Sequence, residues 1–544
     1  MAGYISFNFE LVRVYMSDKQ ASARVMLCAL GLAIAAVNQS AFAAEPAAVS
    51  QAVQNSVMVK RVAFTGNRTF TSEQLSAQIA SDIGKPMSLQ NMRALAEKIE
   101  AFYHGAGYRL VKVVVPGQDF AHMDALQLTV LEGWLGHIEV TGNQRYSDER
   151  VIAALKAGGV ETNKPFTLED VERSLTVLNL QSGIEITSTL QPGKETGSTD
   201  LVVNVKEAPR LQGAIEVNNY GSENTGENRL IPSVKLANVT GRGDELNALS
   251  MSALGEGDLS FQYIDYTTPV NALGTKAHAY YSHGNVDVGR EFRVLDIQGD
   301  NSSWGLGVSH DFVRSARTIY RAEAWLESQD LEQKMLDVVS SDDKVRKLRF
   351  GLSLDNTDLS GRTLASVNLH YGLGEALGGM DDESQLSSRA YARADNTFTK
   401  VSFDLARLQR ITPRLVLIPR LYGQYSLDSL VSSEQWTVGG ITSVAGHAPS
   451  VYSGDHGFTA SLEGRYSLFP ENDRYQVFAR LDHGEVFIKE PYLDQNDSEQ
   501  ITGMTFGLQA RPIDSLELRL DYAVPLSEKT EDGSHLYAQA RYRF

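Results

Sequence analysis

From about residue 211 to the C-terminus, apolar and polar residues alternate with a period of two. Leu348 to Asp355 place Leu, Phe, Leu and Leu on one face and Arg, Gly, Ser and Asp on the other. Leu516 to Tyr522 and Leu536 to Phe544 repeat the alternation, with their charged residues again confined to one face. Successive side chains of a β-strand point to opposite faces, so this pattern predicts antiparallel strands that each have one apolar face.

Two kinds of sheet show such alternation: a soluble sheet with one solvated face and a barrel in a membrane. Three features favour the barrel. The pattern is sustained without a helical segment long enough to cover a sheet, aromatic residues lie at strand ends, and the chain stops on Phe544 at the end of a strand. About 330 residues, at roughly 20 per strand and turn, predict about 16 strands, and closure removes the strand edges that lipid cannot satisfy.

Residues 59–207 lack this alternation and contain a repeat instead. The first copy starts with a short strand that ends in Thr65-Gly66-Asn67, and the second starts with one that ends in Thr141-Gly142-Asn143. Each copy continues with two helical segments and ends in two strands, which predicts two small α+β modules. The predicted helices begin near 72 and 147 and span 89–102 and 168–180, and the later strands span 109–115, 125–131, 184–190 and 201–205.

The helices of the repeat carry recognisable start signals. Ser72 and Thr167 are candidate N-cap residues, and Glu73 and Glu169 follow in the first turn, where an acidic side chain is favourable. Apolar residues recur at helical spacing in both copies and should face a small sheet. These residues are Leu95, Ile99 and Phe102 in the first copy and Val171, Leu175 and Leu178 in the second.

The N-terminus is expected to be a cleaved secretory signal, residues 1–43. Arg24 precedes thirteen apolar residues, 25–37, and Ala41-Phe42-Ala43 gives the small-x-small pattern of a cleavage site. Thirteen apolar residues are too few to span a bilayer, and a buried helix is the alternative reading. Met16 is a possible alternative start. No later segment approaches the ~18 apolar residues of a membrane helix, so we expect the protein to leave the cytoplasm without a helical anchor.

Composition excludes several classes of function. A formal net charge of −17 argues against nucleic acid as a partner, because phosphate binding needs a basic face. The single cysteine, Cys28, lies in the predicted signal, so no disulfide, cysteine metal site or cysteine nucleophile is expected in the mature chain. No phosphate-binding loop, zinc-protease or serine-hydrolase motif is present, and we expect no enzyme activity, cofactor or metal. His447 and Asp455-His456 are interpreted as ordinary polar contacts.

Several short motifs, in this order and spacing, resemble those of the two-partner secretion transporters, also called haemolysin secretion/activation proteins. The Thr-Gly-Asn turns resemble the POTRA domains of the wider superfamily of barrel-assembly and polypeptide-translocation pores. The segment 218–244 resembles the family's first barrel hairpin, and Tyr266 to Pro269 and Tyr522 to Pro525 resemble its strand-ending Tyr-x-x-Pro. The most specific stretch is 423–457, with Trp-Thr-Val-Gly-Gly-Ile-Thr-Ser-Val at its centre. The resemblance covers nearly all of the mature chain.

The resemblance implies that the segment after Gly440 folds back into the pore. The family's loop tip reads Val-Arg-Gly-aromatic, and the matching residues here are Val444, Ala445, Gly446 and His447. In the family, the tip arginine meets an aspartate of the inner wall that matches Asp482. We hypothesise that Arg480, two residues earlier on the same strand face, pairs with Asp482 instead, and that the tip is held less tightly. The alternative is that both are solvated charges without coupling.

The resemblance also implies the function. The expected fold is a transmembrane antiparallel β-barrel of about 16 strands preceded by two POTRA domains, with the barrel in the outer membrane and the domains in the periplasm. The chain would capture an unfolded exoprotein, encoded by a neighbouring gene, and secrete it through the barrel as a monomer in outer-membrane lipid. The alternatives are a passive porin and a barrel-assembly insertase. The expected domains are 44–58 (a short N-terminal segment, too short for the family's plug helix and its linker), 59–134, 135–207 and 208–544.

Overall fold

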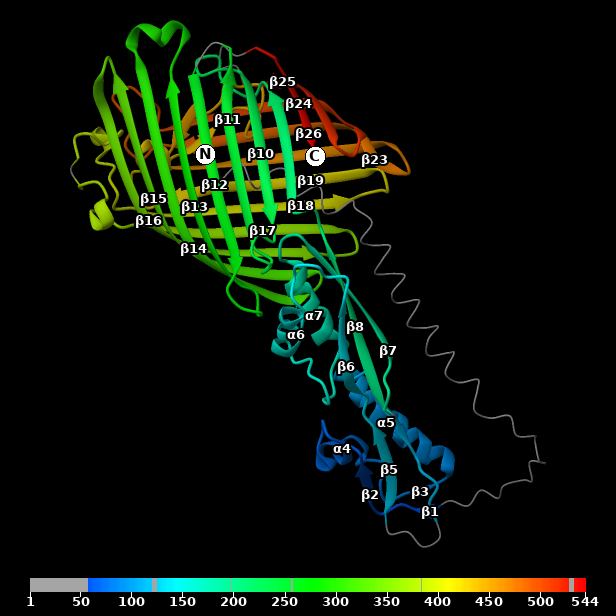
Figure 1. Cartoon of the computed structure of the whole chain (residues 1–544). Helices are drawn as coiled ribbons and strands as arrows, with labels where there is room; N and C mark the ends of the chain where they lie inside the picture. The colour runs from blue at the N-terminus through cyan, green and yellow to red at the C-terminus, as the bar shows by residue number, and fades with distance from the viewer. Residues whose placement is uncertain (1–56, 120–124, 196, 256–257, 383, 528–532) are drawn as a thin grey trace. The chain divides into compact units, whose positions relative to one another are not determined.

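The computed structural model describes residues 57–119, 125–195, 197–255, 258–382, 384–527 and 533–544 (Figure 1). The predicted signal and almost all of the segment 44–58 lie outside the described residues, and so does the expectation that no plug helix is present. Within the described ranges, no helix combines the length and the apolarity needed to cross a membrane.

The first module is a three-stranded sheet with two helices. Its sheet order is β2-β5-β4, in which β2 and β5 pair in parallel and β4 and β5 antiparallel. A continuous apolar core contains Leu75 and Ile79 of the first helix, Leu95 and Ile99 of the second, and the inward residues of the sheet. The elements are β1 Val57–Met58, β2 Val62–Thr65, α4 Ser72–Ile79, β3 Pro86–Met87, α5 Leu89–Gly105, β4 Lys112–Val114 and β5 Leu126–Leu131.

The start of α4 differs from the expectation. The N-cap is Thr71 rather than Ser72, which is the first residue of the helix. Thr71 has an extended backbone, its hydroxyl accepts from the N–H of Gln74, and the Gln74 side chain accepts in return from the N–H of Thr71. This reciprocal capping box satisfies two amide groups, whereas Ser72 would satisfy at most one. The cap therefore lies one residue earlier than predicted.

The second module repeats the plan with the sheet order β6-β8-β7. Thr167 caps α7 as predicted, because its hydroxyl accepts from the N–H of Asp170. Val171, Leu175 and Leu178 are buried on the face of α7 that the helical spacing indicated. The elements are β6 Trp134–Thr141, α6 Asp148–Ala157, α7 Leu168–Asn179, β7 Ile184–Pro192 and β8 Ser198–Glu207.

The repeated Thr-Gly-Asn turn has the same physical basis in both modules. Gly66 and Gly142 have positive φ angles of 82° and 80°, and a Cβ atom on either would collide with a strand carbonyl oxygen. Glu207, at the end of the last strand of the second module, accepts from three consecutive N–H groups after its turn, and Glu132 accepts from two after the first turn. Each turn is thus closed by a glutamate that lies 64 residues away in the first module and 63 in the second.

Residues 211–544 form a closed antiparallel barrel of 16 strands, as predicted (Figure 1). Each strand pairs with its sequence neighbours, apart from a long loop between β19 and β22, and β26 pairs with β9 to complete the barrel. Phe544 exchanges two backbone hydrogen bonds with Gly213. The strands are β9 Leu211–Asn218, β10 Asn228–Ala237, β11 Glu245–Leu254, β12 Asp258–Pro269, β13 Thr275–Asp287, β14 Ile297–Ser315, β15 Thr318–Met335, β16 Val338–Thr357, β17 Gly361–Gly372, β18 Thr399–Arg410, β19 Leu415–Ser426, β22 His456–Phe469, β23 Asn472–Phe487, β24 Ser498–Ile513, β25 Leu516–Pro525 and β26 His535–Arg543.

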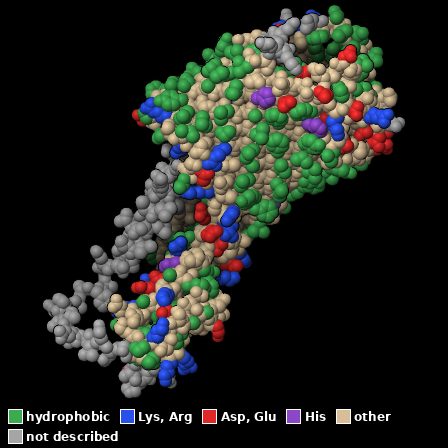
Figure 2. Space-filling model, turned by 180° about the vertical axis from the view of Figure 1, so that it is seen from behind, with side chains coloured by type: hydrophobic (Ala, Val, Ile, Leu, Met, Phe, Trp, Pro, Cys, Tyr) green, Lys and Arg blue, Asp and Glu red, His purple; other side chains and the backbone are tan. Residues whose placement is uncertain are grey.

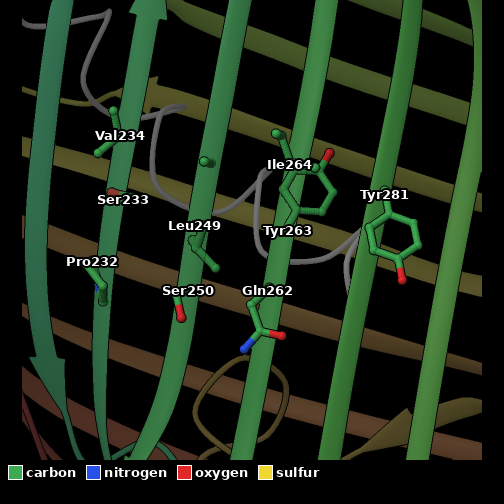
Figure 3. A pocket seen from close by; sticks show the side chains of 10 residues that line it. Pro232, Ser233, Val234, Leu249, Ser250, Gln262, Tyr263, Ile264 and Tyr281 are labelled. Atoms are coloured by element: carbon green, nitrogen blue, oxygen red, sulfur yellow. The ribbon is translucent and has the colours of Figure 1, made fainter.

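The outer face of the barrel is apolar. Figure 2 shows hydrophobic side chains spread over its wall. The register places Val234, Ala248, Ile264 and Tyr281 side by side on β10 to β13, and the small Ala248 leaves a shallow apolar depression between its larger neighbours (Figure 3). Exposed apolar residues alternate with inward, mostly polar ones along much of the barrel wall, which is the arrangement of a barrel surrounded by lipid.

The two ends of the barrel differ. At the end where β9 begins and β26 finishes, the turns are short, such as 316–317 between β14 and β15 and 358–360 between β16 and β17. The opposite end carries the long connections 373–398 and 427–455. The second of these contains a two-stranded hairpin of its own, β20 Trp436–Val438 and β21 Tyr452–Gly454.

Candidate functional site: the inward loop and the barrel wall

The loop 427–455 packs against the inner face of the barrel. Its predicted tip residues Val444, Ala445 and His447 are fully buried. Val444 belongs to an apolar cluster with Val486 of β23 and Ile501 of β24. Ala445 belongs to a second cluster, with Ala523 of β25 and Tyr537 of β26 and with Ile441 of the loop. The tip therefore contacts four consecutive strands of the wall.

Glycines of the wall make room for the tip. A Cβ atom at Gly503 would lie 2.1 Å from the carbonyl oxygen of Ala445, and one at Gly484 would lie 2.9 Å from the side chain of Val444. Gly446 has a φ of 91°, and a Cβ atom there would lie 2.8 Å from the backbone nitrogen of Pro525. Backbone approaches this close exclude any larger residue without displacement of the loop.

Arg480 and Asp482 face the lumen on β23 and form an ion pair of 2.8 Å. Asp482 is 1% exposed, so the alternative of two solvated charges does not describe this structure. Arg480 also donates to the carbonyl oxygen of Ile441, at 2.9 Å. The wall arginine thus joins the wall aspartate to the loop backbone. Whether the tip is held less tightly than a tip arginine would hold it stays a prediction.

The same wall carries further pairs of the same design. On β25, Arg519 pairs with Asp521 two residues later, at 2.8 Å, and on β22 Arg465 pairs with Glu463. The Arg519 guanidinium lies 4.7 Å from the centre of the Phe478 ring on β23. Residues two apart on a strand point to one face, so each pair lies flat along the lumen wall. The inner wall beside the loop tip is therefore lined with mutually neutralised charges.

The remaining bonds of the tip are mainly neutral. His447 contacts the carbonyl oxygen of Thr502 through Nε2 at 3.0 Å. The hydroxyl of Tyr422 donates to the carbonyl oxygen of Thr442 at 3.1 Å. The N–H of Gly440 donates to the carbonyl oxygen of His447, which closes the tip on itself. These contacts bring all four predicted tip residues to the wall that carries Arg480 and Asp482.

A buried ion triad holds the start of the loop, and the sequence analysis did not find it. Glu434, in the short 3-10 helix Ser432–Glu434, lies 2.5 Å from Nζ of Lys347 on β16 and 2.8 Å from Nζ of Lys400 on β18. Its side chain is 2% exposed. Burial alone would raise the pKa of the Glu434 carboxyl, but the two ammonium groups hold it well below its ordinary value. Glu434 is therefore ionised at neutral pH.

Asp455 closes the other end of the loop. Its carboxylate lies 2.5 Å from the Arg389 guanidinium of the loop 373–398 and accepts from the N–H of Leu430 and of Lys489. Arg389 also donates to the carbonyl oxygen of Leu430. Leu430 packs with Phe398 and Met380 in an apolar cluster. The two long loops at this end of the barrel are thus joined through one buried ion pair.

The site residues that the sequence analysis did not find have little in the sequence to mark them. Lys347 and Lys400 are ordinary inward charges in period-two strands, and Gly484 and Gly503 are ordinary strand glycines. Only the register brings them together, since 87 residues separate Lys347 from Glu434. Glu434 lies inside the motif-rich stretch 423–457, and this position is the one feature of the sequence that could have drawn attention to it.

The chain combines two small α+β modules with a closed 16-stranded barrel that has an apolar outer wall, a charged lumen and an inward loop. This combination defines an outer-membrane transporter of the POTRA-and-barrel class. The profile of the haemolysin secretion/activation proteins (ShlB/FhaC/HecB) matches residues 197–510, and that of the ShlB-type POTRA domain matches residues 57–133. The chain belongs to the haemolysin secretion/activation protein family. It is an outer-membrane secretion transporter whose POTRA domains lie in the periplasm.

Individual relatives agree with this assignment. The heme/hemopexin transporter protein HuxB of Haemophilus influenzae is 23% identical over 91% of this chain and 88% of its own length. The outer membrane transporter CdiB of Dickeya dadantii is 25% identical over 73% of this chain and 70% of its own length. The solved structure of CdiB from Escherichia coli superposes with a TM-score of 0.74 over 97% of this chain and 99% of that one, at 20% identity.

Proposed function

We propose that the two POTRA domains, residues 59–134 and 135–207, bind an unfolded exoprotein and deliver it to the barrel, residues 208–544. Strands β4 and β7 lie at the edges of their sheets, where an extended segment can pair with the backbone. Such pairing reads backbone more than side chains, which suits an unfolded client. The client's own folding outside the cell would supply the direction of transport. We propose that the transporter acts as a monomer in outer-membrane lipid.

The loop 427–455 is proposed to be the gate. The observation that carries this is the burial of the tip residues Val444, Ala445 and His447 against the inner wall. A barrel of 16 strands encloses an aqueous channel, and a loop packed across its inner face narrows that channel. A client chain would need this space, so the tip has to leave the wall during transport. Arg480 and Asp482 are proposed to hold the closed position.

The relatives are named as transporters. HuxB is named as a heme/hemopexin transporter and CdiB as an outer membrane transporter. For this chain we propose a large secreted protein, encoded by a neighbouring gene, as the partner. Export of that protein should require the transporter: we expect it at the cell surface or in the medium only when both are expressed together. Unchanged export without this chain would contradict the proposal and favour a porin.

The gate can be tested by one added methyl group. In Gly503→Ala the new Cβ would lie 2.1 Å from a loop carbonyl oxygen, so the tip must move away from the wall. We expect larger and longer openings in planar bilayers. Gly464→Ala is the matched control, because its Cβ would meet only one side-chain atom, at 3.4 Å. Equal conductance of the two variants would exclude the tip as the gate.

A further inference from the structure

The loop 427–455 consists of two parts that are held by different chemistry. We call residues 430–438 and 452–455 the stem and residues 439–451 the tip. The two halves of the stem pair with each other through β20 and β21, from Trp436 opposite Gly454 to Val438 opposite Tyr452. The tip lies between them and ends the hairpin.

Buried charges hold the stem. Glu434 lies between the ammonium groups of Lys347 and Lys400, and its carbonyl oxygen also accepts from Lys400 and from the side chain of Gln424. Charged hydrogen bonds are roughly twice as strong as neutral ones, and removal of one partner leaves the others charged and buried. The stem cannot leave the wall without separating three charges that the barrel has desolvated.

The second half of the stem is held in the same way. Asp455 is fully buried, pairs with Arg389 and accepts from two backbone N–H groups. Tyr452 packs against an apolar cluster in which Trp436 and Val438 of the first half meet Tyr422 of β19 and Val486 of β23. Strands and loops on both sides of the hairpin therefore fix the stem.

The tip is held by apolar contacts and by hydrogen bonds with Tyr422, Thr459, Thr502 and Arg480 of the wall. Among these bonds, the one with a charged side chain is the bond that Arg480 donates to the carbonyl oxygen of Ile441. The tip is also a closed unit, because the N–H of Gly440 donates to the carbonyl oxygen of His447. Gly439 and Gly440, with φ angles of 112° and 82°, join it to the stem. Glycines adopt many backbone conformations, so this junction can act as a hinge.

We infer that the stem stays bound to the barrel wall during transport and that only the tip, hinged at Gly439 and Gly440, swings away from the wall formed by β23 to β26. Glu434, Lys347 and Lys400 are then positioning residues for the gate. The inference rests on the proposed function, in which this loop is the gate, and adds which part of it moves.

Two alternative disulfides, each to a cysteine at the same wall position, can distinguish movement of the stem from movement of the tip. A Cβ atom at Gly484 would lie 3.1 Å from Cβ of Val438 in the stem and 2.9 Å from Cγ2 of Val444 in the tip. A disulfide needs Cβ atoms about 3.5–4.5 Å apart, so each pair can be joined by a small shift of the loop away from the wall once the valine is replaced by cysteine. The single variant Gly484→Cys carries the same shift. The chain's own cysteine is Cys28, in the predicted signal. The variants are Val438→Cys/Gly484→Cys and Val444→Cys/Gly484→Cys in the full chain, with Gly484→Cys alone as control.

The readout is export of the neighbouring secreted protein under oxidising conditions and after reduction. We expect the stem disulfide to leave export at the level of Gly484→Cys, and the tip disulfide to stop export until it is reduced. If both disulfides stop export, the whole loop moves and the inference is wrong. If neither does, the loop does not move at all and the proposed gate itself is wrong. Disulfide formation is verified on gels for each variant.

The ion triad can be tested by charge. Glu434→Gln leaves Lys400 without its anion and Lys347 with only the more distant Glu327, at 3.9 Å, so the stem should loosen and the pore should open more often in planar bilayers. The matched control is Glu490→Gln, at an exposed position outside the strands. Glu434→Lys/Lys400→Glu restores attraction between positions 434 and 400 but sets a second ammonium group beside Lys347, so it should restore only part of the closed time. A difference in gel mobility between heated and unheated samples shows whether each barrel is folded. A folded Glu434→Gln variant that behaves like Glu490→Gln would overturn the role of the triad.

Discussion

Arg480 is a charged residue of the barrel wall that contacts the inward loop. The family pattern places an arginine in the loop tip, and here the tip has Ala445 instead. Arg480 of the wall lies between Asp482 and the loop carbonyl of Ile441. An arginine presents several donors in a fixed plane, so it can bind a carboxylate and a carbonyl oxygen at once. The contact between loop and wall is thus made by a residue of the wall.

Arg480 and Asp482 should be coupled. Arg480→Ala removes the bond to the loop and leaves the buried Asp482 unpaired, so we expect frequent pore openings and reduced folded yield. Asp482→Asn should be milder, because Arg480 keeps its bond to the loop. The double variant Arg480→Ala/Asp482→Asn should be less disturbed than the sum of the single ones. Conductance and export are measured for all three, and strictly additive effects would contradict the coupling.

Glu207 predicts a pH dependence outside the barrel. Burial alone would raise the pKa of its carboxyl, but the N–H groups of Tyr146, Arg145 and Gln144 hold the pKa below its ordinary value. A carboxyl whose pKa is lower in the folded state than in the unfolded state stabilises the folded protein at pH values above the unfolded pKa of about 4.3. This stabilisation disappears as the pH falls through the folded pKa.

Glu207→Gln should therefore loosen the second POTRA turn at pH 7, and its effect should shrink as the pH falls below about 4.3. Solvent screening limits the expected loss to about 1 kcal/mol. Hydrogen exchange of the amides 144–146 in the full chain, relative to the unchanged protein at each pH, measures it. Glu195→Gln, in a turn of the same module, is the control. A difference that is as large at pH 3 as at pH 7 would contradict the assigned cause.

At the scale of the element, local patterns predicted what depends on local physics. The period-two alternation located the barrel strands, and helical spacing located the buried face of α7, because both follow from backbone geometry alone. The cap of α4 was misplaced by one residue, since Thr71 and Ser72 are both good caps and only the partner Gln74 decides between them. Boundaries are set by such side-chain competition.

The site was only partly predictable for the same reason. The family motif pointed to Val444 through His447 and to Asp482, and the period of two added Arg480. Glu434, Lys347 and Lys400 come from one loop and two strands that meet only through the register of β16 to β19. A single sequence contains no register, so inward lysines in a charged lumen cannot be assigned partners before the barrel is closed.

The alternation also predicts how a strand responds to charge. Val367 and Ser366 are neighbours in the middle of β17, and the register turns Val367 to the exposed outer face and Ser366 toward Asp404 of β18. Val367→Arg should cost about 2–4 kcal/mol of folding stability, since arginine at the bilayer midplane is costly. Ser366→Arg should cost much less. Urea-dependent folding into lipid vesicles compares the two, and equal losses would show that the outer face does not meet lipid.

At the scale of the whole molecule, the two parts of the chain solve different physical problems. The barrel closes every strand edge, which lipid requires, whereas the small sheets of the POTRA domains keep edge strands, which an aqueous compartment permits. A pore for small solutes needs only the first part. A transporter of polypeptides gains from the second, because edge strands can hold an unfolded chain.

Deletion of residues 59–207 therefore separates conduction from export. The barrel residues 208–544 pair only among themselves in the closed sheet, so the truncated chain, given its own signal, should still fold and conduct ions. Export of the neighbouring secreted protein should be lost, because no edge strand presents the client to the lumen. Bilayer conductance and secretion from co-expressing cells are measured on the same preparations. Export that survives the deletion would show that the barrel receives its client directly and that the POTRA domains serve another purpose.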